Sequence, residues 1–411
     1  MIRTLLLLGA TGDLAGRYLL PALGALEAAG RLPNGFRVVG GARTALDDDG
    51  FRRLAGDTLP TDMLAYRPVD LADPSSLAAA LDAAPNPVAV YLALPPAAFA
   101  TTIKSLGQVD LRSGSRVVVE KPFGDDLESA HQLNALLGET GADAYRVDHV
   151  LGMHTTRNLA ALRRANPVLE KLWNGESVEQ VDILWEETLA LEGRAGYYDH
   201  AGALKDVLQN HMLQLLALVA MDPPTDDDLH ERKVEALRSV RLPTCSRRAR
   251  YTAGTLADGR DVPAYADEEG VDPARGTETF AEVVLELDTP RWSGTRFVLR
   301  AGKALARRRK LVQLSFQGGG RLEVGIDGPR DIVLGLHGAA KDPLELRAPA
   351  PGDALPPYAH VLLDVLGGTN ALSVGGDEAQ QAWRVVAPVL AAWKAGEIPL
   401  TDYPAGAAGP V

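Results

Sequence analysis

Cysteine is almost absent from this chain, since Cys245 is the only one among 411 residues. A disulfide within the chain needs two cysteines and a cysteine-based zinc site needs more, so both are excluded. Long apolar runs are also missing, because the N-terminal run at 4–10 stops at a glycine turn, far short of the roughly 20 residues that span a bilayer. We therefore expect a cytoplasmic protein with no targeting signal and no membrane partner.

An excess of basic residues is lacking as well. The chain has 42 Lys and Arg against 54 Asp and Glu, which gives a formal net charge of -12. This acidic balance argues against nucleic acid or an anionic membrane as the main partner, so we expect a small-molecule partner. The hydrophobic content of 46% and the length suffice for two domains with separate cores.

The first 150 residues alternate short apolar runs with helix-like segments, which is the pattern of a doubly wound parallel sheet. The expected strands are the runs at 4–10, 36–42, 87–95, 116–121 and 144–149. Ligands of such sheets bind beyond the carboxyl ends of the strands, where this chain concentrates its glycines, prolines and charges.

A glycine-rich turn, GATGDLAGR at 9–17, follows the first expected strand. Glycines allow the tight turn and a close approach to a pyrophosphate, which then meets the free N–H groups of the following helix. The spacing is not GxGxxG, so a plain strand-to-helix turn is the alternative. Arg43 stands after the second expected strand, where an NAD-specific fold usually has an acid. A cation there favours NADP, and a solvated surface arginine is the alternative.

The apolar helix expected at 205–221 begins with three polar residues, Asp206, Asn210 and His211. Polar groups in such surroundings need a partner or a chemical role. We interpret His211 as a catalytic base, with a hydrogen-bonded core histidine as the alternative.

Several further motifs carry a resemblance to a known family. They are LALPP (92–96), VVEKPFGDDLESA (118–130), RVDHVLGMHTTRNL (146–159), the stretch 193–224 with its D-x-x-QNH pattern, FVLRAGKAL (297–305), YAHVLLDVLGG (358–368) and DEAQQAWRVVAPVL (377–390). With these motifs in this order over nearly its whole length, the chain resembles the glucose-6-phosphate dehydrogenase family.

The resemblance implies an α/β plus α+β protein. An N-terminal doubly wound dinucleotide-binding (Rossmann) domain is expected over 1–150, and a β+α domain with a large, mostly antiparallel sheet over 151–411. Strand-like runs at 178–192, 278–288, 295–303, 310–319 and 321–328 agree with the second domain. We expect the Pro/Gly/Ala-rich tail at 398–411 to be loose or packed on the surface. The family also implies a homodimer through the large sheet.

The family reaction implied is oxidation of C1 of a glucose-type pyranose to the 1,5-lactone, with NAD(P) as hydride acceptor. A base must then take the proton of the C1 hydroxyl, and His211 matches the family's base. Asp206 cannot readily orient it, because five residues along an α-helix rotate two side chains roughly 140° apart. Asp148 is the better candidate, and the resemblance implies the same dyad.

Other roles are carried over residue by residue. The expected cofactor residues are Gly9, Thr11, Gly12, Asp13, Leu14, Arg17, Arg43, Pro95 and Lys121. The expected substrate residues are Lys121, His149, Glu187, Asp206 and Lys303. Lys121 can bridge substrate and cofactor, and we predict a cis bond before Pro122. A turn with a surface lysine is the alternative at 121, and a salt bridge is the alternative for Glu187 and Lys303.

The chain departs from the family where the 6-phosphate binds. The family pattern there is DHYLGK, whose His, Tyr and Lys reach the phosphate, whereas residues 148–153 read DHVLGM. Losing two charge-assisted hydrogen bonds should weaken phosphate binding by about two to four powers of ten. Val150 and Met153 would instead line a pocket for an uncharged C6. His154 is a candidate replacement for the missing lysine.

Three hypotheses follow. The main one is a C1 dehydrogenase of glucose or another sugar that lacks the 6-phosphate. The second is an ordinary glucose-6-phosphate 1-dehydrogenase, and the third is a non-catalytic nucleotide-binding regulatory relative. Retention of Lys121, Asp148 and His211 speaks against the third. NADP is the expected cofactor, with NAD as the alternative and no metal.

Overall fold

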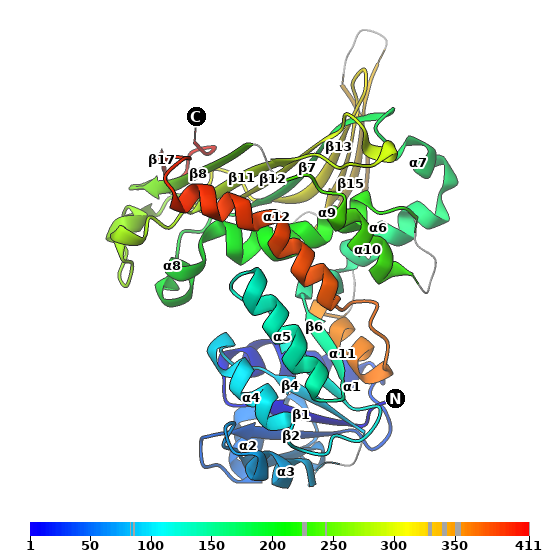
Figure 1. Ribbon diagram of the computed structural model, residues 1–411, viewed down its shortest axis with the longest axis vertical. Helices are drawn as coiled ribbons and strands as arrows, with labels where there is room; N and C mark the ends of the chain where they lie inside the picture. The colour runs from blue at the N-terminus through cyan, green and yellow to red at the C-terminus, as the bar shows by residue number, and fades with distance from the viewer. Residues whose placement is uncertain are drawn as a thin grey trace. The chain divides into compact units, whose positions relative to one another are not determined.

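The computed structural model describes residues 1–82, 84, 87–223, 228–242, 245–327, 331–338, 343–349 and 355–410. The chain forms two compact units (Figure 1). Unit 1 contains Met1–His154 and Asp353–Gln380, and unit 2 contains Thr155–Gly352 and Gln381–Val411. Within the described ranges, no helix has the length and apolar character needed to cross a membrane.

Unit 1 has a parallel sheet, as predicted, but with six strands where five were expected, in the order β3-β2-β1-β4-β5-β6. Its strands are β1 (Thr4–Leu8), β2 (Arg37–Ala42), β3 (Leu64–Pro68), β4 (Val88–Leu92), β5 (Arg116–Glu120) and β6 (Asp143–Val147). The sequence analysis did not predict β3. That edge strand reads LAYRP and is buried only at Leu64 and Tyr66, so it shows no continuous apolar run.

Helices cover both faces of this sheet, as Figure 1 shows. They are η1 (Ala15–Leu19), α1 (Leu20–Ala28), α2 (Asp48–Ala55), η2 (Gly56–Thr58), η3 (Thr61–Met63), α3 (Pro74–Asp82), η4 (Pro96–Ala98), α4 (Phe99–Leu106), α5 (Leu127–Glu139), η5 (His149–Gly152) and α11 (Pro357–Gly367). Leu5 and Leu7 of β1 lie in one core cluster with residues of α1 and α11. The alternation of a strand turns Leu6 toward the opposite face.

Helix α11 lies in unit 1, although it follows residue 150, where the sequence analysis placed the start of the second domain. Its buried residues Ala359, Val361, Leu362 and Val365 belong to the same core cluster as Leu5 of β1. A hydrogen bond also joins α11 to this sheet, because the Tyr145 hydroxyl of β6 donates to Asp364 Oδ2 of α11 at 2.7 Å. The chain therefore returns to unit 1 after most of unit 2 has been built.

Unit 2 is organised around a nine-stranded sheet in the order β16-β15-β14-β13-β7-β12-β11-β8-β17. Six of its eight strand pairs are antiparallel, which confirms the mostly antiparallel prediction; β7–β12 and β8–β17 are parallel. The strands are β7 (Val178–Glu186), β8 (Cys245–Thr252), β11 (Phe280–Leu285), β12 (Arg296–Gly302), β13 (Arg309–Phe316), β14 (Arg321–Gly325), β15 (Asp331–His337), β16 (Pro343–Pro349) and β17 (Leu400–Pro404). A separate short ribbon pairs β9 (Gly254–Thr255) with β10 (Asp261–Val262).

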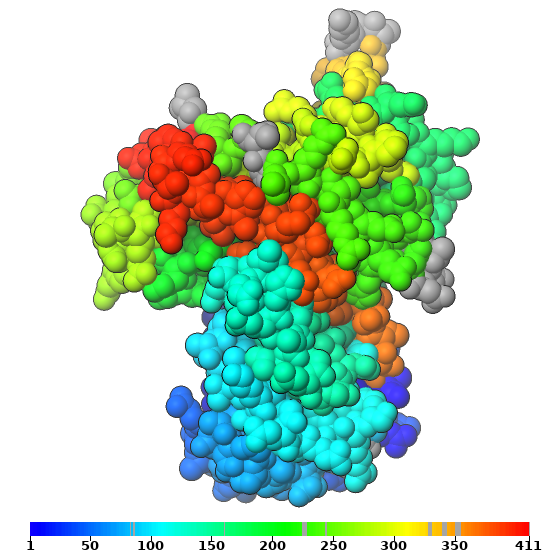
Figure 2. All heavy atoms as spheres, in the orientation of Figure 1, coloured from blue at the N-terminus to red at the C-terminus, as the bar shows by residue number. Residues whose placement is uncertain are grey.

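The helices that accompany this sheet include the one predicted to carry the base. They are α6 (His154–Ala165), α7 (Pro167–Leu172), α8 (Ala195–Ala203), η6 (Leu204–Met212), α9 (Leu213–Ala220), α10 (Leu229–Arg238), η7 (Tyr265–Asp267), η8 (Pro273–Arg275), η9 (Pro290–Trp292) and α12 (Gly376–Lys394). From Gln381 onward α12 belongs to unit 2. Its orange-to-red surface crosses the face of unit 2 that Figure 2 shows.

The C-terminal tail is ordered and packed, which corresponds to the second of the two expectations for it. Residues 400–404 form β17 beside β8, and Tyr403 is 1% exposed. The Tyr403 hydroxyl donates to the backbone oxygen of Lys303 at 2.7 Å, and Ala306 N donates to Ala407 O at 2.8 Å. The tail therefore supports the backbone of a predicted substrate residue.

Candidate functional site

The glycine turn after β1 has the geometry expected of a close backbone approach. Gly9 has φ +86°, and a Cβ there would lie 2.1 Å from the backbone oxygen of Ala93, which follows β4. Gly12 N donates to Gly9 O at 2.9 Å, so the chain turns tightly before η1 begins at Ala15. The turn lies between β1 and β4, where the strand order reverses, and such switch points bind dinucleotides.

The other predicted cofactor residues lie at the same carboxyl edge of the unit 1 sheet. Arg43, Pro95 and Lys121 follow β2, β4 and β5, and the first two are exposed. The turn after β1 carries Thr11, Gly12, Asp13 and Leu14, and Arg17 lies in η1, which follows this turn. Because parallel strands end at a common edge, these residues are distributed along the same edge of the sheet.

Lys121 directly follows a buried carboxyl group that the sequence reading did not single out. Glu120 accepts a hydrogen bond from the Tyr91 hydroxyl at 2.5 Å and another from Tyr358 of α11. Burial raises the pKa of Glu120 to about 7, against the opposing effect of the Tyr91 hydrogen bond. The Lys121–Pro122 peptide bond is cis, which confirms that prediction.

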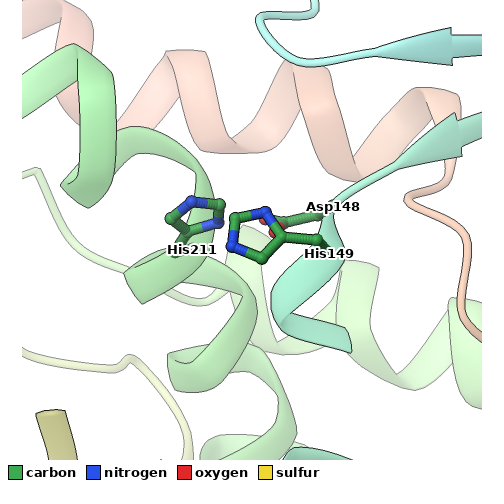
Figure 3. A group of neighbouring side chains, drawn as sticks. All are labelled: Asp148, His149 and His211. Carbon is green, nitrogen blue, oxygen red and sulfur yellow. The ribbon is translucent and has the colours of Figure 1, made fainter. Parts of the chain in front are cut away.

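Asp148 and His149 are the last two predicted site residues that lie in unit 1. Asp148 is fully buried and follows β6, and its Oδ1 accepts from Val150 N at 3.1 Å. The His149 ring stacks on Tyr358, with centroids 6.0 Å apart. Figure 3 draws these two side chains on the turn after β6 together with His211, which belongs to unit 2.

Val150 is fully buried, whereas the sequence-based expectation placed it on the surface of a pocket for an uncharged C6. Its exposed fraction is 0%, because η5 packs closely against α11. A Cβ at Gly152 would lie 2.4 Å from Pro357 O, which shows how little space separates the two segments. Of the two apolar replacements, Met153 alone is partly exposed.

In unit 2, His211 lies on η6, a π-helical segment. In a π-helix the hydrogen bond joins residue i to i+5, so side chains five positions apart lie near the same face. The predicted rotation between Asp206 and His211 assumed an α-helix and is therefore wrong. His211 is 3% exposed, and its ring stacks on Trp185 of β7 with centroids 5.3 Å apart.

Glu278 binds the start of η6 through hydrogen bonds. It is a second buried acid that the sequence analysis did not predict as a site residue. Leu204 N donates to Glu278 Oε1 at 3.0 Å, and Ala203 N donates to Glu278 O at 3.1 Å. A Cβ at Gly202 would meet this carboxylate at 2.4 Å. Burial raises the pKa of Glu278 to about 7, although the N–H of Leu204 favours the charged form.

Asp206 faces a pocket of about 290 Å³ in unit 2. Its lining residues are Leu191, Arg194, Gly196, Tyr197, Tyr198, Asp206 and Lys303. The Lys303 ammonium lies 5.1 Å from the centre of the Tyr198 ring. Two predicted substrate residues therefore share one pocket that offers a carboxylate, phenol rings and cations.

The third predicted substrate residue of unit 2, Glu187, lies between two lysines. Lys303 Nζ is 2.7 Å from its Oε2, and Lys310 Nζ is 2.9 Å from its Oε1. Burial raises the pKa of Glu187, but the two ammonium groups outweigh it and hold that pKa at about 2. The salt bridge given as the alternative for Glu187 and Lys303 is thus present.

Some residues at the site were not predicted from the sequence, because the local sequence around them does not indicate a function. Lys310 closes the run Arg307–Lys310, which reads as a solvated charge cluster, and Trp185 reads as a core aromatic. Glu120 stands inside the EKP motif and could have been noticed there. Nothing in the local sequence indicates that Tyr358, more than 200 residues away, contacts it.

Comparisons with known proteins agree over the whole chain. Residues 6–158 match the family model described as "Glucose-6-phosphate dehydrogenase, NAD binding domain", and residues 160–322 and 343–411 match "Glucose-6-phosphate dehydrogenase, C-terminal domain". A glucose-6-phosphate 1-dehydrogenase of Gluconobacter oxydans is 35% identical, with 98% of this chain and 93% of that protein covered.

Solved structures are similar too. A glucose-6-phosphate dehydrogenase in complex with its substrate glucose-6-phosphate has a TM-score of 0.90 at 26% identity, covering 100% of this chain and 96% of the other. The glucose-6-phosphate 1-dehydrogenase of Mycobacterium avium has a TM-score of 0.87 at 31% identity, covering 100% and 95%.

Proposed function

Because the chain belongs to the glucose-6-phosphate dehydrogenase family, we propose that it oxidises C1 of glucose 6-phosphate to the 1,5-lactone. The observation that carries this proposal is the full-length similarity to relatives named glucose-6-phosphate 1-dehydrogenase. It favours the phosphorylated substrate over the phosphate-free sugar expected from Val150 and Met153. The burial of Val150 removes one argument for the phosphate-free sugar, since that residue offers no surface to an uncharged C6.

The cofactor of the proposed reaction is NADP, with NAD as the second candidate. Gly9 lets the turn after β1 pack directly against Ala93, at the switch point of the sheet where dinucleotides bind. Arg43 supplies a cation beyond β2 for a 2′-phosphate. The cofactor residues proposed are those at the carboxyl edge of the unit 1 sheet. When bound, the nicotinamide accepts the hydride from C1.

The chain's own residues handle the proton and the sugar. His211 takes the proton of the C1 hydroxyl, and Asp148 remains its proposed orienting carboxylate. Trp185 limits the motion of the His211 ring by stacking on it. Asp206 accepts hydrogen bonds from sugar hydroxyls in the unit 2 pocket.

Three further residues complete the proposed substrate site. Lys121 bridges substrate and cofactor by donating hydrogen bonds, and Glu187 accepts from a sugar hydroxyl. His149 donates to the phosphate, as the family motif implies. The Glu187 carboxylate is well suited to accept, since its two lysine partners keep it ionised.

The proposal is tested by His211→Asn in an assay of NADPH formation from glucose 6-phosphate. Loss of a general base should lower kcat by about 10²–10⁴-fold, while calorimetric binding of glucose 6-phosphate stays close to the parent value. His200→Asn on α8 is the matched control, because that histidine is exposed. Unchanged kcat in His211→Asn would contradict the assigned base.

A second outcome concerns the regulatory alternative. A parent chain that binds NADP without oxidising any sugar would support a non-catalytic nucleotide-binding relative. For assembly we propose a homodimer through the large sheet, which predicts twice the chain mass of 43.7 kDa in sedimentation.

A further inference from the structure

Lys303, Glu187 and Lys310 form a compact group that we call the lysine–glutamate cluster. One carboxylate is shared by two ammonium groups at 2.7 and 2.9 Å. The side chains are mostly removed from solvent, with exposed fractions of 7% for Lys303, 24% for Glu187 and 10% for Lys310. Ion pairs in such surroundings are screened much less than surface pairs.

The cluster carries a positive excess when the two groups joined to it by ion pairs, Asp327 and Arg308, are counted with it. Asp327 lies 3.4 Å from Lys310 and 2.7 Å from Arg308. The five groups give three positive charges and two negative ones, a net charge of one. Without Lys310 the same set would be neutral, so this lysine decides whether the group attracts an anion.

The cluster adjoins both the sugar pocket and the aromatic support of the proposed base. Lys303 lines the pocket that also contains Asp206. Lys310 Nζ lies 4.5 Å from the centre of the Trp185 ring, and that ring stacks on His211. Strand pairing fixes this arrangement, because Lys310 of β13 lies directly opposite Trp185 of β7.

We propose that Lys310 is a specificity residue that favours a phosphorylated sugar. By sharing Glu187, it leaves the charge of Lys303 incompletely neutralised, so that the cluster attracts the phosphate dianion. This inference rests on the proposed function and explains how the chain tolerates Val150 and Met153 in place of two phosphate ligands. Lys310 acts through Glu187 and Lys303 and is thus a positioning residue.

The test compares Lys310→Met with Lys310→Arg and with the control Arg309→Met. Methionine keeps the length of the side chain and removes its charge, while arginine keeps the charge. Arg309 is the adjacent cation on β13 and pairs with Glu186 at 2.6 Å, on the opposite face of the sheet. Thermal unfolding checks that each variant is folded.

Two measurements are made on each variant. Calorimetry without cofactor gives the affinities for glucose 6-phosphate and for glucose, and steady-state assays give KM and kcat. In Lys310→Met we expect glucose 6-phosphate affinity to fall about 10–100-fold and KM to rise in step. Glu187 would then pair with Lys303 alone and neutralise it, so the charge-assisted contact of Lys303 with the phosphate would weaken. Glucose affinity and kcat should change less than about threefold.

The outcomes separate this inference from the proposed function. Retention of glucose 6-phosphate affinity by Lys310→Arg and by Arg309→Met would support the role of the charge at position 310. Equal losses for both sugars, or an equal loss in Arg309→Met, would overturn it. If the parent binds glucose 6-phosphate through Lys310 but does not oxidise it, the inference stands and the proposed function fails.

Discussion

Arg43 is the residue on which the choice of cofactor depends most directly. It is exposed beyond the carboxyl end of β2, where a ribose-binding acid would favour NAD. Arg43→Ala should lower kcat/KM for NADP by about 10–100-fold and leave kcat/KM for NAD nearly unchanged. Steady-state kinetics with both cofactors measures this.

The control for that change is Arg53→Ala, since Arg53 is an exposed arginine on α2. It removes the same charge from the same unit and should leave both cofactors unaffected. An equal effect of Arg43→Ala on NADP and NAD would show that Arg43 does not read the 2′-phosphate.

Single residues were predictable where a motif carries them. The turn containing Gly9, the cis bond before Pro122 and the polar start of the helix with His211 all follow from short local patterns. Lys310 and Tyr358 could not be predicted in this way, because their partners come from other strands and helices. The shared contact with Glu187 exists only after β7, β12 and β13 have paired.

At the scale of elements, the turn between β1 and η1 should not accommodate a side chain in place of Gly9. Gly9→Ala would place a Cβ 2.1 Å from Ala93 O at a φ of +86°, whereas a Cβ at Gly16 meets nothing within 4 Å. We therefore expect Gly9→Ala to lower Tm by several degrees and to raise KM for NADP, because strain and overpacking together cost about 1–3 kcal/mol. Thermal unfolding and cofactor titration measure both effects.

Gly16→Ala is the matched control for this turn. It lies in the same loop-to-helix segment and should leave Tm and cofactor KM unchanged within error. Equal tolerance at positions 9 and 16 would show that the approach of the backbone to Ala93 is unimportant.

The buried carboxyl group of Glu278, which accepts a hydrogen bond from the start of η6, should make the free energy of unfolding depend on pH. Burial raises the pKa of Glu278 from 4.5 to about 7. Between these values the folded chain keeps a proton that the unfolded chain has released, so the free energy of unfolding falls as pH rises. Glutamine at 278 cannot ionise, and its carbonyl can still accept from Leu204 N.

The Tm of Glu278→Gln minus the Tm of the parent should therefore increase by a few degrees as the pH rises from about 5 to about 8. Other titrating groups are common to both proteins and cancel in the difference. A difference in Tm that is constant over this range would mean that Glu278 titrates alike in the folded and unfolded chains.

Elements were predicted well where apolar runs are continuous and poorly elsewhere. The five buried strands of unit 1 follow from such runs, but β3 and β17 are half-polar edge strands with a proline. The π-helical form of η6 has no signal in its composition. It changes which side chains share a face, and for this reason the geometric argument against Asp206 failed.

For the whole molecule, the order of motifs was enough to predict both sheets and the family. The packing of α11 in unit 1 could not be predicted, because α11 lies more than 200 residues from the β1 core that it covers. An apolar helix pattern states that a face is buried and does not state against which sheet. The same limit applies to the choice of substrate, because the sequence pattern predicts that Val150 faces the sugar, whereas Val150 is buried under α11.

The most direct test of the central claim is the ratio of kcat/KM for glucose 6-phosphate to that for glucose, measured with NADP under identical conditions. The phosphate contacts proposed for His149 and the lysine–glutamate cluster predict a preference of about 10²-fold or more for the phosphorylated sugar. Equal values, or a preference for glucose, would contradict the account.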